Sequence, residues 1–255
     1  MSVWAVGMCK DESDVVASTV ANMITQVDRV IIADNGSTDG TREILETFDI
    51  DIIDDPEVGY FQSRKMTALA NLAREGGADW VVPFDMDEWW YSPFGRVGDV
   101  LAGIPEEWLI ASAALYDHVA TALDPDEPDP IKRIRYRRQK PAPLPKVAVR
   151  CLDNLTIDQG NHSATYGFRP AALPGQLIIR HFPYRSAEQF VSKARNGAKA
   201  YGATDLPESA GAHWRGYGRI LADSGVDACA EIFRTWFWQP DGTDLIYDPV
   251  IDLAE

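Results

Sequence analysis

Cysteine is scarce in this chain: Cys9, Cys151 and Cys229 are the only three, and no two of them form a Cys-x-x-Cys pair. An odd number of widely spaced cysteines argues against a disulfide framework and against a zinc site. No apolar run approaches the length that spans a bilayer. The apolar stretch within residues 1–10 is short and has no basic segment before it, so it does not resemble a secretory signal. We therefore expect a cytoplasmic protein without a membrane span.

Positive charge is also in deficit, with 24 lysine and arginine residues against 39 acidic ones and a formal net charge of −15. Such a surface excludes nonspecific binding to nucleic acid or anionic membrane as the main activity. One segment reverses the balance, because acidic residues at 124–129 are followed by basic residues at 132–140. We interpret it as a solvated loop with compensating charges, or alternatively as a mobile arm over a phosphate or an anionic acceptor.

The chain has no low-complexity tract, no repeat and no Gly-x-Gly-x-x-Gly phosphate loop, which argues against a dinucleotide site. Its 255 residues suffice for one large α/β domain. We expect that domain over residues 1–205, with a helical and aromatic extension at 206–255 packed on it. Trp214, Trp236 and Trp238 in the extension predict acceptor binding, core packing or a homodimer contact.

Short apolar runs alternate with helix-like segments in the first half of the chain, which is typical of a parallel sheet with crossover helices. The expected strands are 3–8, 29–34, 50–54 and 80–84, and the expected helices are 14–24, 38–47 and 61–75. After residue 91 we expect a mixed sheet beside the parallel one, with strands at 109–115, 146–150, 154–157 and 176–181 and a short helix at 97–104. A capping box at Ser186–Gln189 predicts the start of another helix.

Two carboxylates emerge where the buried run 80–84 reaches the edge of its sheet, in the sequence Asp85-Met86-Asp87-Glu88. Alternate side chains of an extended chain share a face, so Asp85 and Asp87 can converge on one divalent cation, which prefers oxygen ligands. The alternative is a solvated strand end. The turn 34–41 places Asp34 at the carboxyl end of another strand, where ligands bind in open α/β sheets.

His181 and Arg185 lead into the helix that follows Ser186. Because a helix N-terminus exposes unpaired N–H groups and positive dipole, these side chains could form a diphosphate site there. A core or capping histidine is the alternative for His181.

Together, Lys10–Glu12, the turn 34–41 and Gly77–Glu88 resemble the family 2-like nucleotide-sugar glycosyltransferases of GT-A fold. The resemblance is clear over residues 3–91, with weaker similarity at 146–150, 160–162 and 181–185. It implies a Rossmann-like, mostly parallel sheet flanked by helices and extended by a mixed C-terminal sheet and helices. Where relatives often have Lys-Asn-Glu, this chain has Asp11, which replaces an amide with a carboxylate.

The resemblance also implies roles for individual residues. It assigns base contacts to Glu12 and Asp34, a ribose contact to Asp85 and metal ligation to Asp87. Family 2-like enzymes often add a C-terminal histidine to the metal shell, for which His181 is our choice and His162 the alternative. The remaining candidates for binding the nucleotide sugar are Met8, Lys65, Met86 and Arg185.

The implied reaction is metal-dependent transfer of a sugar from a nucleotide-diphosphate donor, expected to be a UDP-sugar, to a hydroxyl of a glycan, a protein or a modified nucleobase. Bound Mn²⁺ or Mg²⁺ would reverse the repulsion between diphosphate and this acidic protein and stabilise the departing charge. An inverting displacement also needs a base, for which the candidates are Glu88, Asp158 and His162.

The sequence is also compatible with other functions. A noncatalytic nucleotide- or carbohydrate-binding protein could share the fold, and a glycosyltransferase acting on modified DNA bases could use the basic residues at 132–140. An aspartyl-phosphate phosphatase would carry threonine or valine where this chain has Trp89.

Overall fold

The computed structural model describes residues 1–251, so the last four positions of the expected extension lie outside the described part. The chain divides into two compact units. The first comprises residues 1–55, 61–116 and 140–181, and the second comprises 56–60, 117–139 and the residues from 182 onward. The predicted boundary at residue 205 stays a prediction; it falls inside the second unit.

The first unit is built on an eight-stranded sheet of order β3-β2-β1-β4-β9-β6-β12-β5. Its first four strands run parallel. These strands are β1 (Val3–Cys9), β2 (Arg29–Asp34), β3 (Asp51–Asp54) and β4 (Trp80–Asp85). The helices between them are α1 (Val16–Gln26), α2 (Thr41–Leu45) and α3 (Gln62–Glu75). The predicted α/β class with crossover helices is thus confirmed.

Antiparallel pairing extends the sheet beyond β4. The added strands are β5 (Glu88–Tyr91), β6 (Ile110–Asp117), β9 (Lys146–Arg150) and β12 (Ala172–His181). Smaller elements of the same region are α4 (Val97–Ala102), β10 (Thr156–Ile157), the 3-10 turn η1 (Gln159–Asn161) and β11 (Ala164–Thr165). Every strand predicted after residue 91 is present, whereas β5 was not predicted.

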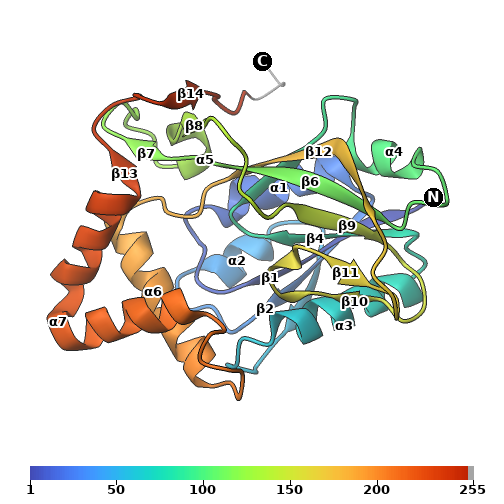
Figure 1. Ribbon diagram of the computed structural model, residues 1–255, viewed down its shortest axis with the longest axis horizontal. Coiled ribbons are helices and arrows are strands. Elements are labelled where there is room, and N and C mark those ends of the chain that lie inside the picture. The colour runs from blue at the N-terminus through green and yellow to red at the C-terminus, as the bar shows by residue number, and fades with distance from the viewer. Residues whose placement is uncertain (252–255) are drawn as a thin grey trace. The chain divides into compact units, whose positions relative to one another are not determined.

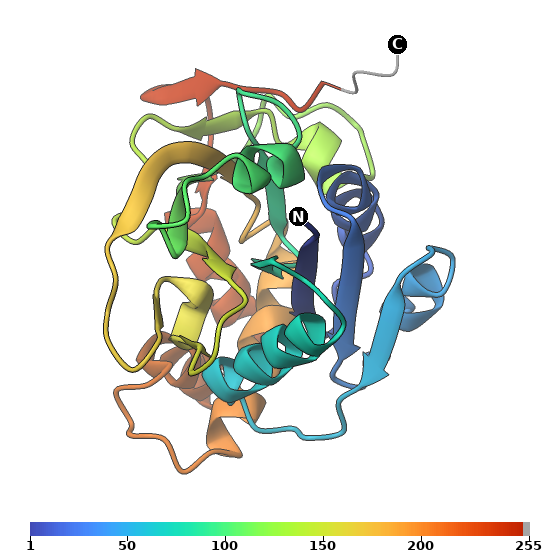
Figure 2. The same cartoon turned by 90° about the vertical axis from the view of Figure 1, so that its right-hand side faces the viewer.

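Hydrophobic side chains cover both faces of the parallel strands, as expected where helices lie on either side. Along β1, Val3 and Ala5 belong to the cluster that packs under α1 and α4. Trp4 and Val6, which point the other way, belong to the cluster under α3. Figures 1 and 2 show α1 and α3 on opposite faces of these strands. Only the strand ends are therefore left to carry polar chemistry.

The second unit is helical with short strand pairs. Its elements are β7 (Ala120–Thr121), α5 (Pro130–Arg133), β8 (Tyr136–Arg138), α6 (Ala187–Gly202), α7 (Ala212–Trp236), β13 (Trp238–Gln239) and β14 (Leu245–Tyr247). Strand β13 pairs with β7 and β14 pairs with β8. Helices α6 and α7 pack closely, since a Cβ at Gly218 would lie 2.3 Å from the Ala198 Cβ atom. Helix α7 bends at Gly225, whose φ is +84°.

The charged segment that follows residue 124 is ordered in this structure. Arg133 donates to the carbonyls of Glu127 and Pro128, and Arg137 forms an ion pair of 3.0 Å with Asp248. These arginines therefore stabilise the fold of the second unit through internal contacts. The segment is therefore more than a solvated loop with compensating charges, because Arg133 and Arg137 hold parts of the second unit together.

None of the helices within residues 1–251 is both long and apolar enough to cross a membrane.

The predicted cap of α6 is confirmed and gives a first testable prediction. Ser186 Oγ accepts the N–H of Gln189 at 3.1 Å, and Gln189 Oε1 accepts the N–H of Arg185 at 3.2 Å. Replacing Ser186 with alanine is expected to lower the free energy of unfolding by about 1 kcal/mol, measured by urea denaturation. Ser192→Ala, inside the same helix, is the control and should change it by less than about 0.5 kcal/mol. Equal losses in the two variants would contradict a capping role.

Candidate active site

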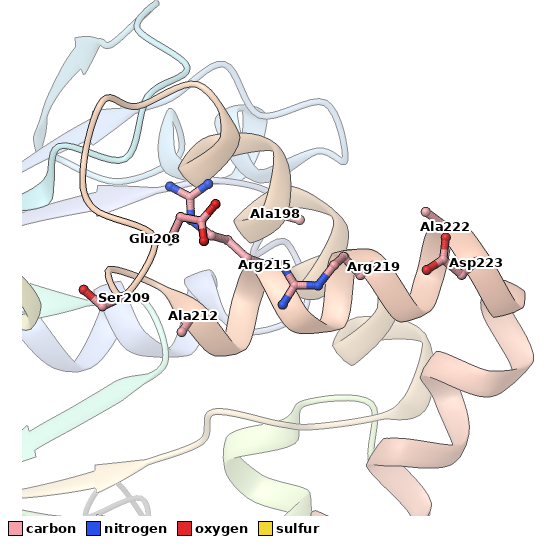
Figure 3. Close-up of a pocket in the computed structure, with 9 residues that line it drawn as sticks. Ala198, Glu208, Ser209, Ala212, Arg215, Arg219, Ala222 and Asp223 are labelled. Atoms are coloured by element: carbon pink, nitrogen blue, oxygen red, sulfur yellow. The ribbon is translucent and has the colours of Figure 1, made fainter.

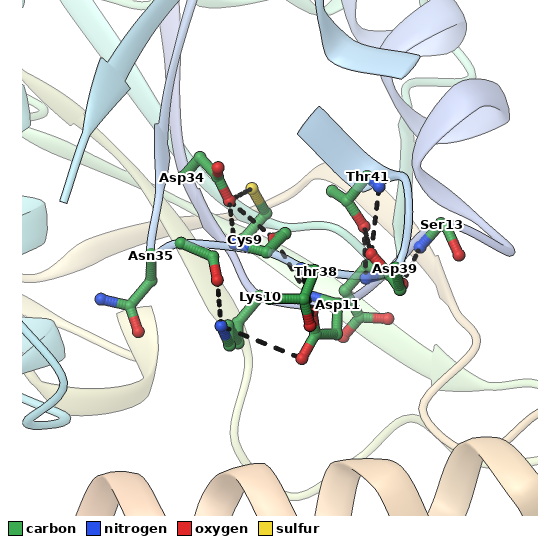
Figure 4. Close-up of polar contacts among 12 residues, drawn as sticks. Cys9, Lys10, Asp11, Ser13, Asp34, Asn35, Thr38, Asp39 and Thr41 are labelled. Carbon is green, nitrogen blue, oxygen red and sulfur yellow. Dashed lines mark hydrogen bonds and ion pairs between the residues drawn. The ribbon is translucent and has the colours of Figure 1, made fainter. Parts of the chain in front are cut away.

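The loops after β1 and β2 are held together by side chains at the carboxyl ends of the strands (Figure 4). Asp11 has φ of +52°, in the left-handed region, and its Oδ1 accepts the N–H of Thr38 at 2.8 Å. Lys10 Nζ donates to the Gly36 carbonyl, and the Glu12 N–H donates to Thr41 Oγ1 at 2.8 Å. Each loop thus fixes the other before any ligand binds.

Asp34 is buried at the end of β2 and organises the turn that follows. Its Oδ1 accepts from both the N–H and the hydroxyl of Ser37, at 3.0 and 2.6 Å. Cys9 Sγ also donates to this oxygen, at 3.6 Å, and burial together with the nearby Asp34 charge raises the pKa of the thiol. Arg42 Nη1 lies 3.9 Å from the other oxygen, Oδ2. The predicted position of Asp34 at a strand end is therefore observed, and the buried Cys9 thiol stays protonated.

Asp85 ends β4 with its carboxylate held by three donors from distant parts of the chain. Lys146 Nζ lies 2.5 Å from Oδ2. Gln62 Nε2 and Asn161 Nδ2 donate to Oδ1 at 3.2 and 3.3 Å. The first carboxylate of the Asp-x-Asp sequence is therefore neutralised and oriented by the protein itself, which leaves it poorly suited to hold a metal ion.

Glu88 is fully buried beneath this cluster. Its Oε2 accepts from the Asp85 N–H at 3.2 Å and from Trp90 Nε1 at 3.0 Å, and its Oε1 lies 2.8 Å from Lys146 Nζ. Burial raises the pKa of this carboxyl, against the opposing effect of Lys146. Glu88 therefore orients the Asp85 turn, and its burial makes it a poor base for an incoming acceptor.

Lys146 is the cation at the centre of the cluster, and only 4% of the residue is exposed. Burial alone would lower the pKa of its ammonium group. The carboxylates of Asp85 and Glu88 outweigh this effect and hold the pKa above its ordinary value. Lys146 is therefore charged across the physiological range and offsets one of the two negative charges beside it.

Asp87 and His181 face each other a short distance from the Asp85 cluster. Strands β5 and β12 pair Glu88 with His181, which places the imidazole beside the residue just before β5. His181 Nε2 lies 3.7 Å from Asp87 Oδ1, and both side chains are largely buried. No group of three His, Cys, Asp or Glu side chains able to hold a metal occurs within residues 1–251. The structure thus brings the two predicted ligands together as a pair.

This donor set fits a divalent cation that also binds substrate. Carboxylate and imidazole groups suit Mn²⁺, and Mg²⁺ is ordinarily held by one or two carboxylates together with substrate phosphates and water. A site with two protein donors leaves coordination positions for a diphosphate. A structural site closed by four protein ligands would not.

His162 and Asp158 flank η1 and meet different surroundings. His162 Nδ1 lies 2.8 Å from the Pro145 carbonyl. Asp158 Oδ2 lies 2.9 Å from Arg169 Nη2 and accepts the hydroxyl of Ser163. The carboxylate of Asp158 is thus already occupied by a charged partner.

The other residues predicted to bind the nucleotide sugar lie in different environments. Met8, half-buried at the end of β1, pairs in register with Asp85. Lys65 Nζ lies 2.5 Å from Asp55 Oδ2. The Met86 side chain is buried in the core against Gly7, so only its backbone could meet a ligand. Arg185 is buried in the second unit, where it donates to the Phe182 carbonyl.

A separate groove of about 630 Å³ runs along α6 and α7 in the second unit (Figure 3). Arg215 in its wall donates to the carbonyls of Tyr201 and Ala210, so this guanidinium is used by the fold. None of the predicted site residues lines the groove. In the same unit, the three tryptophans of the expected extension differ in their surroundings: Trp214 packs on Gly197, whereas Trp236 is 70% exposed and Trp238 36%.

Three residues of the site were not predicted: Gln62, Lys146 and Asn161. Lys146 and Asn161 lie in segments that were recognised only as weak similarity, at 146–150 and 160–162. The available signals were a lysine beginning an apolar strand and a Gly-Asn pair before His162. Such local signals mark an unusual residue but do not indicate that it contacts Asp85.

A model of the family described as glycosyl transferase family 2 matches residues 6–154. A comparison with curated protein sequences finds no match.

Solved structures similar to the chain include glycosyltransferases. A mannosyltransferase from Pyrobaculum calidifontis in complex with GDP-mannose and Mn²⁺ is 15% identical, with a TM-score of 0.44, and the match covers 92% of this chain and 74% of that one. Glucosyl-3-phosphoglycerate synthase from Mycobacterium tuberculosis is 14% identical, with a TM-score of 0.39 and coverage of 82% and 81%. Mannosyl-3-phosphoglycerate synthase from Rubrobacter xylanophilus is 14% identical, with a TM-score of 0.39 and coverage of 82% and 79%.

The family model spans more than half of the chain and includes both the Asp34 turn and the Asp-x-Asp sequence. The chain belongs to glycosyl transferase family 2.

Proposed function

We propose that this glycosyltransferase moves a sugar from a nucleoside-diphosphate donor, expected to be a UDP-sugar, to an acceptor hydroxyl with inversion at the anomeric carbon. The proposal rests mainly on the different surroundings of the two aspartates in the Asp-x-Asp sequence. Asp85 is held and neutralised by Lys146, whereas Asp87 faces His181 at 3.7 Å. The pair Asp87 and His181 would hold Mn²⁺ or Mg²⁺, and Asp85 would bind the ribose.

Electrostatics support this assignment. The chain carries a formal net charge of −15, and a carboxylate repels a phosphate charge at 4 Å by roughly 1–4 kcal/mol, depending on the effective dielectric. When bound, the metal would supply Lewis-acid stabilisation of the charge that develops on the departing diphosphate. Lys146 already offsets one of the three negative charges of Asp85, Asp87 and Glu88, so one divalent ion would offset the other two and remove the net repulsion of an anion.

The turns after β1 and β2 supply the proposed base pocket. The Glu12 N–H donates to Thr41 Oγ1 and joins the two turns, and Asp34 holds the second turn by accepting the N–H of Ser37. Both residues thus lie at the carboxyl-end side of adjacent parallel strands. Ligands bind at such ends in open α/β sheets, because the helices cover both faces. Preorganised loops lower the entropy cost of binding a nucleotide.

Assays of a panel of UDP- and GDP-sugars with Mn²⁺, with and without a chelator, would test the proposal. The expected result is metal-dependent release of nucleoside diphosphate from a UDP-sugar, and proton NMR of the product should show an inverted anomeric configuration. Calorimetry with UDP and Mn²⁺ is the parallel measurement. Binding of UDP without consumption of any nucleotide sugar would identify a noncatalytic binding protein and overturn the proposal.

A further inference from the structure

We propose that His162 is the general base of the transfer. This inference rests on the proposed function and names the group that receives the acceptor proton. As the acceptor oxygen forms its bond to the anomeric carbon, its proton passes to His162 Nε2, and the bond from the anomeric carbon to the diphosphate breaks with both electrons leaving on the diphosphate. His162 leaves the step as an imidazolium and then returns its proton to solvent.

The position of His162 follows from two chain segments that run beside Asp85. Lys146 and Asn161 both hold the Asp85 carboxylate, through Nζ at 2.5 Å and Nδ2 at 3.3 Å. Their neighbours Pro145 and His162 contact each other across the same two segments, at 2.8 Å. The imidazole is therefore tied to the immediate surroundings of the Asp-x-Asp sequence, and it is only partly buried.

The contact with Pro145 selects the tautomer of the imidazole. A carbonyl oxygen can only accept a hydrogen bond, so Nδ1 must carry the proton and donate it. In the neutral ring, Nε2 then has an unprotonated lone pair. No side chain or backbone group within residues 1–251 hydrogen-bonds or ion-pairs with this Nε2, which leaves it available to a bound hydroxyl.

Gly160 permits this placement of the ring. It has φ of +79°, and a Cβ atom there would lie 2.5 Å from His162 Cδ2 and 2.7 Å from Nε2. Both the backbone conformation and the close approach therefore require glycine. The loop holds the imidazole in one orientation instead of leaving it free to rotate.

The surroundings also favour the neutral base. Burial is the largest cause that lowers the pKa of His162. The electrostatic effects of Lys146 and His181 act in the same direction. The Pro145 carbonyl and the Asp85 carboxylate act in the opposite direction without reversing the shift. At neutral pH the ring is therefore unprotonated and able to accept a proton.

The competing candidates are less well placed. Both oxygens of Glu88 are buried and contact Asp85, Trp90 or Lys146. Asp158 Oδ2 already lies 2.9 Å from Arg169 Nη2 and accepts the hydroxyl of Ser163. His162 Nε2, in contrast, has no hydrogen bond or ion pair with the described residues, and the ring is held in place through Nδ1.

Asn161, next to His162, gives independent evidence that this loop meets a ligand. It is fully buried and has φ of +57°, an uncommon conformation for a residue other than glycine. Its Nδ2 donates to Asp85, which fixes the orientation of the amide and leaves Oδ1 buried without a hydrogen-bond donor among the described residues. Buried orphan acceptors are rare and commonly mark a water or ligand site.

Two variants of His162 test the proposal. His162→Gln keeps a side-chain N–H for the Pro145 carbonyl but removes the base, and sugar transfer is expected to fall at least about a hundredfold. His162→Ala should lose as much and should recover at least about tenfold when imidazole is added at pH 7.5. Binding of UDP and Mn²⁺ should stay within about threefold of the unmodified enzyme in both variants. The matched control is His213→Gln, in α7, which should keep full activity with no response to imidazole.

Transfer within about threefold of normal in His162→Gln would overturn the proposal, as would loss of activity in His162→Ala without recovery by imidazole. Should His162→Ala fail to fold, His162→Gln alone provides the test, because it keeps a donor for the Pro145 carbonyl. Failure of the proposed function is distinguishable, because the unmodified enzyme would then consume no nucleotide sugar.

Discussion

Replacing Asp87 with asparagine is expected to reduce nucleotide-sugar turnover by about a thousandfold while leaving the fold intact. Asparagine keeps the size of the side chain but removes the negative charge that a divalent ion needs. A metal contributes several kcal/mol of charge stabilisation to such reactions, and a loss of about 4 kcal/mol corresponds to about a thousandfold in rate. Only His181 would remain of the pair that lies 3.7 Å apart.

Binding of Mn²⁺, followed by electron paramagnetic resonance, gives a measurement independent of turnover. In the Asp87→Asn variant, the affinity for Mn²⁺ in the presence of UDP should fall at least about tenfold. Asp223→Asn on α7 is the matched control, since this aspartate is exposed and distant in sequence from the pair. Turnover within about threefold of normal, in a folded variant, would contradict the assignment of Asp87 as a metal ligand.

The parallel half of the sheet was predictable because its signals are local. Each strand is a short apolar run, each helix has its own periodicity, and the turn chemistry between them is visible in adjacent residues. The predicted helix 38–47 is shorter in the structure, at Thr41–Leu45, because residues 34–40 form a turn organised by Asp34 and Ser37.

Strand β5 was missed because its sequence, Glu-Trp-Trp-Tyr, begins with a charge that normally marks a surface position. In the structure Glu88 and Trp90 are buried while Trp89 and Tyr91 are half-buried. The buried carboxylate is compensated by Lys146, which lies far away in the sequence. A pattern of single residues could not have shown that partner.

The separation along the chain between contacting residues determined which site residues were predictable. Asp34, Asp85 and Asp87 follow strand signals directly, so their location at strand ends could be inferred. Gln62, Lys146 and Asn161 meet Asp85 across 23, 61 and 76 residues of chain. Contacts of that separation are products of the assembled fold and leave no local pattern.

Asp11 shows how the structure accounts for a departure from the family pattern. The residue sits at φ of +52°, a conformation that asparagine and aspartate tolerate better than most side chains. Its Oδ1 accepts the N–H of Thr38, a role that an amide oxygen would perform equally well. The exchange of an amide for a carboxylate therefore preserves the link between the two loops.

Replacing Lys146 with methionine is expected to lower the free energy of unfolding by about 3–5 kcal/mol, because it leaves the fully buried Glu88 carboxylate, beside the partly buried Asp85, without its cation. The ammonium group lies 2.5 Å from Asp85 and 2.8 Å from Glu88, and Glu88 has no exposure to water that could replace it. Urea or guanidinium denaturation measures the change. Lys140→Met, at an exposed lysine, is the control and should stay within about 0.5 kcal/mol.

A second substitution separates the loss of charge compensation from the loss of packing. Glu88→Gln removes the buried negative charge, so adding it to Lys146→Met should cost less than the sum of the two single changes by at least about 1 kcal/mol. Methionine fills much of the volume of the lysine stem, and packing alone therefore predicts simple addition. Additive losses in this cycle, or a Lys146→Met variant as stable as the Lys140→Met control, would show that the cluster does not depend on its lysine. A coupled loss would instead mean that the positive charge of Lys146 offsets the free-energy cost of burying Glu88 beside Asp85.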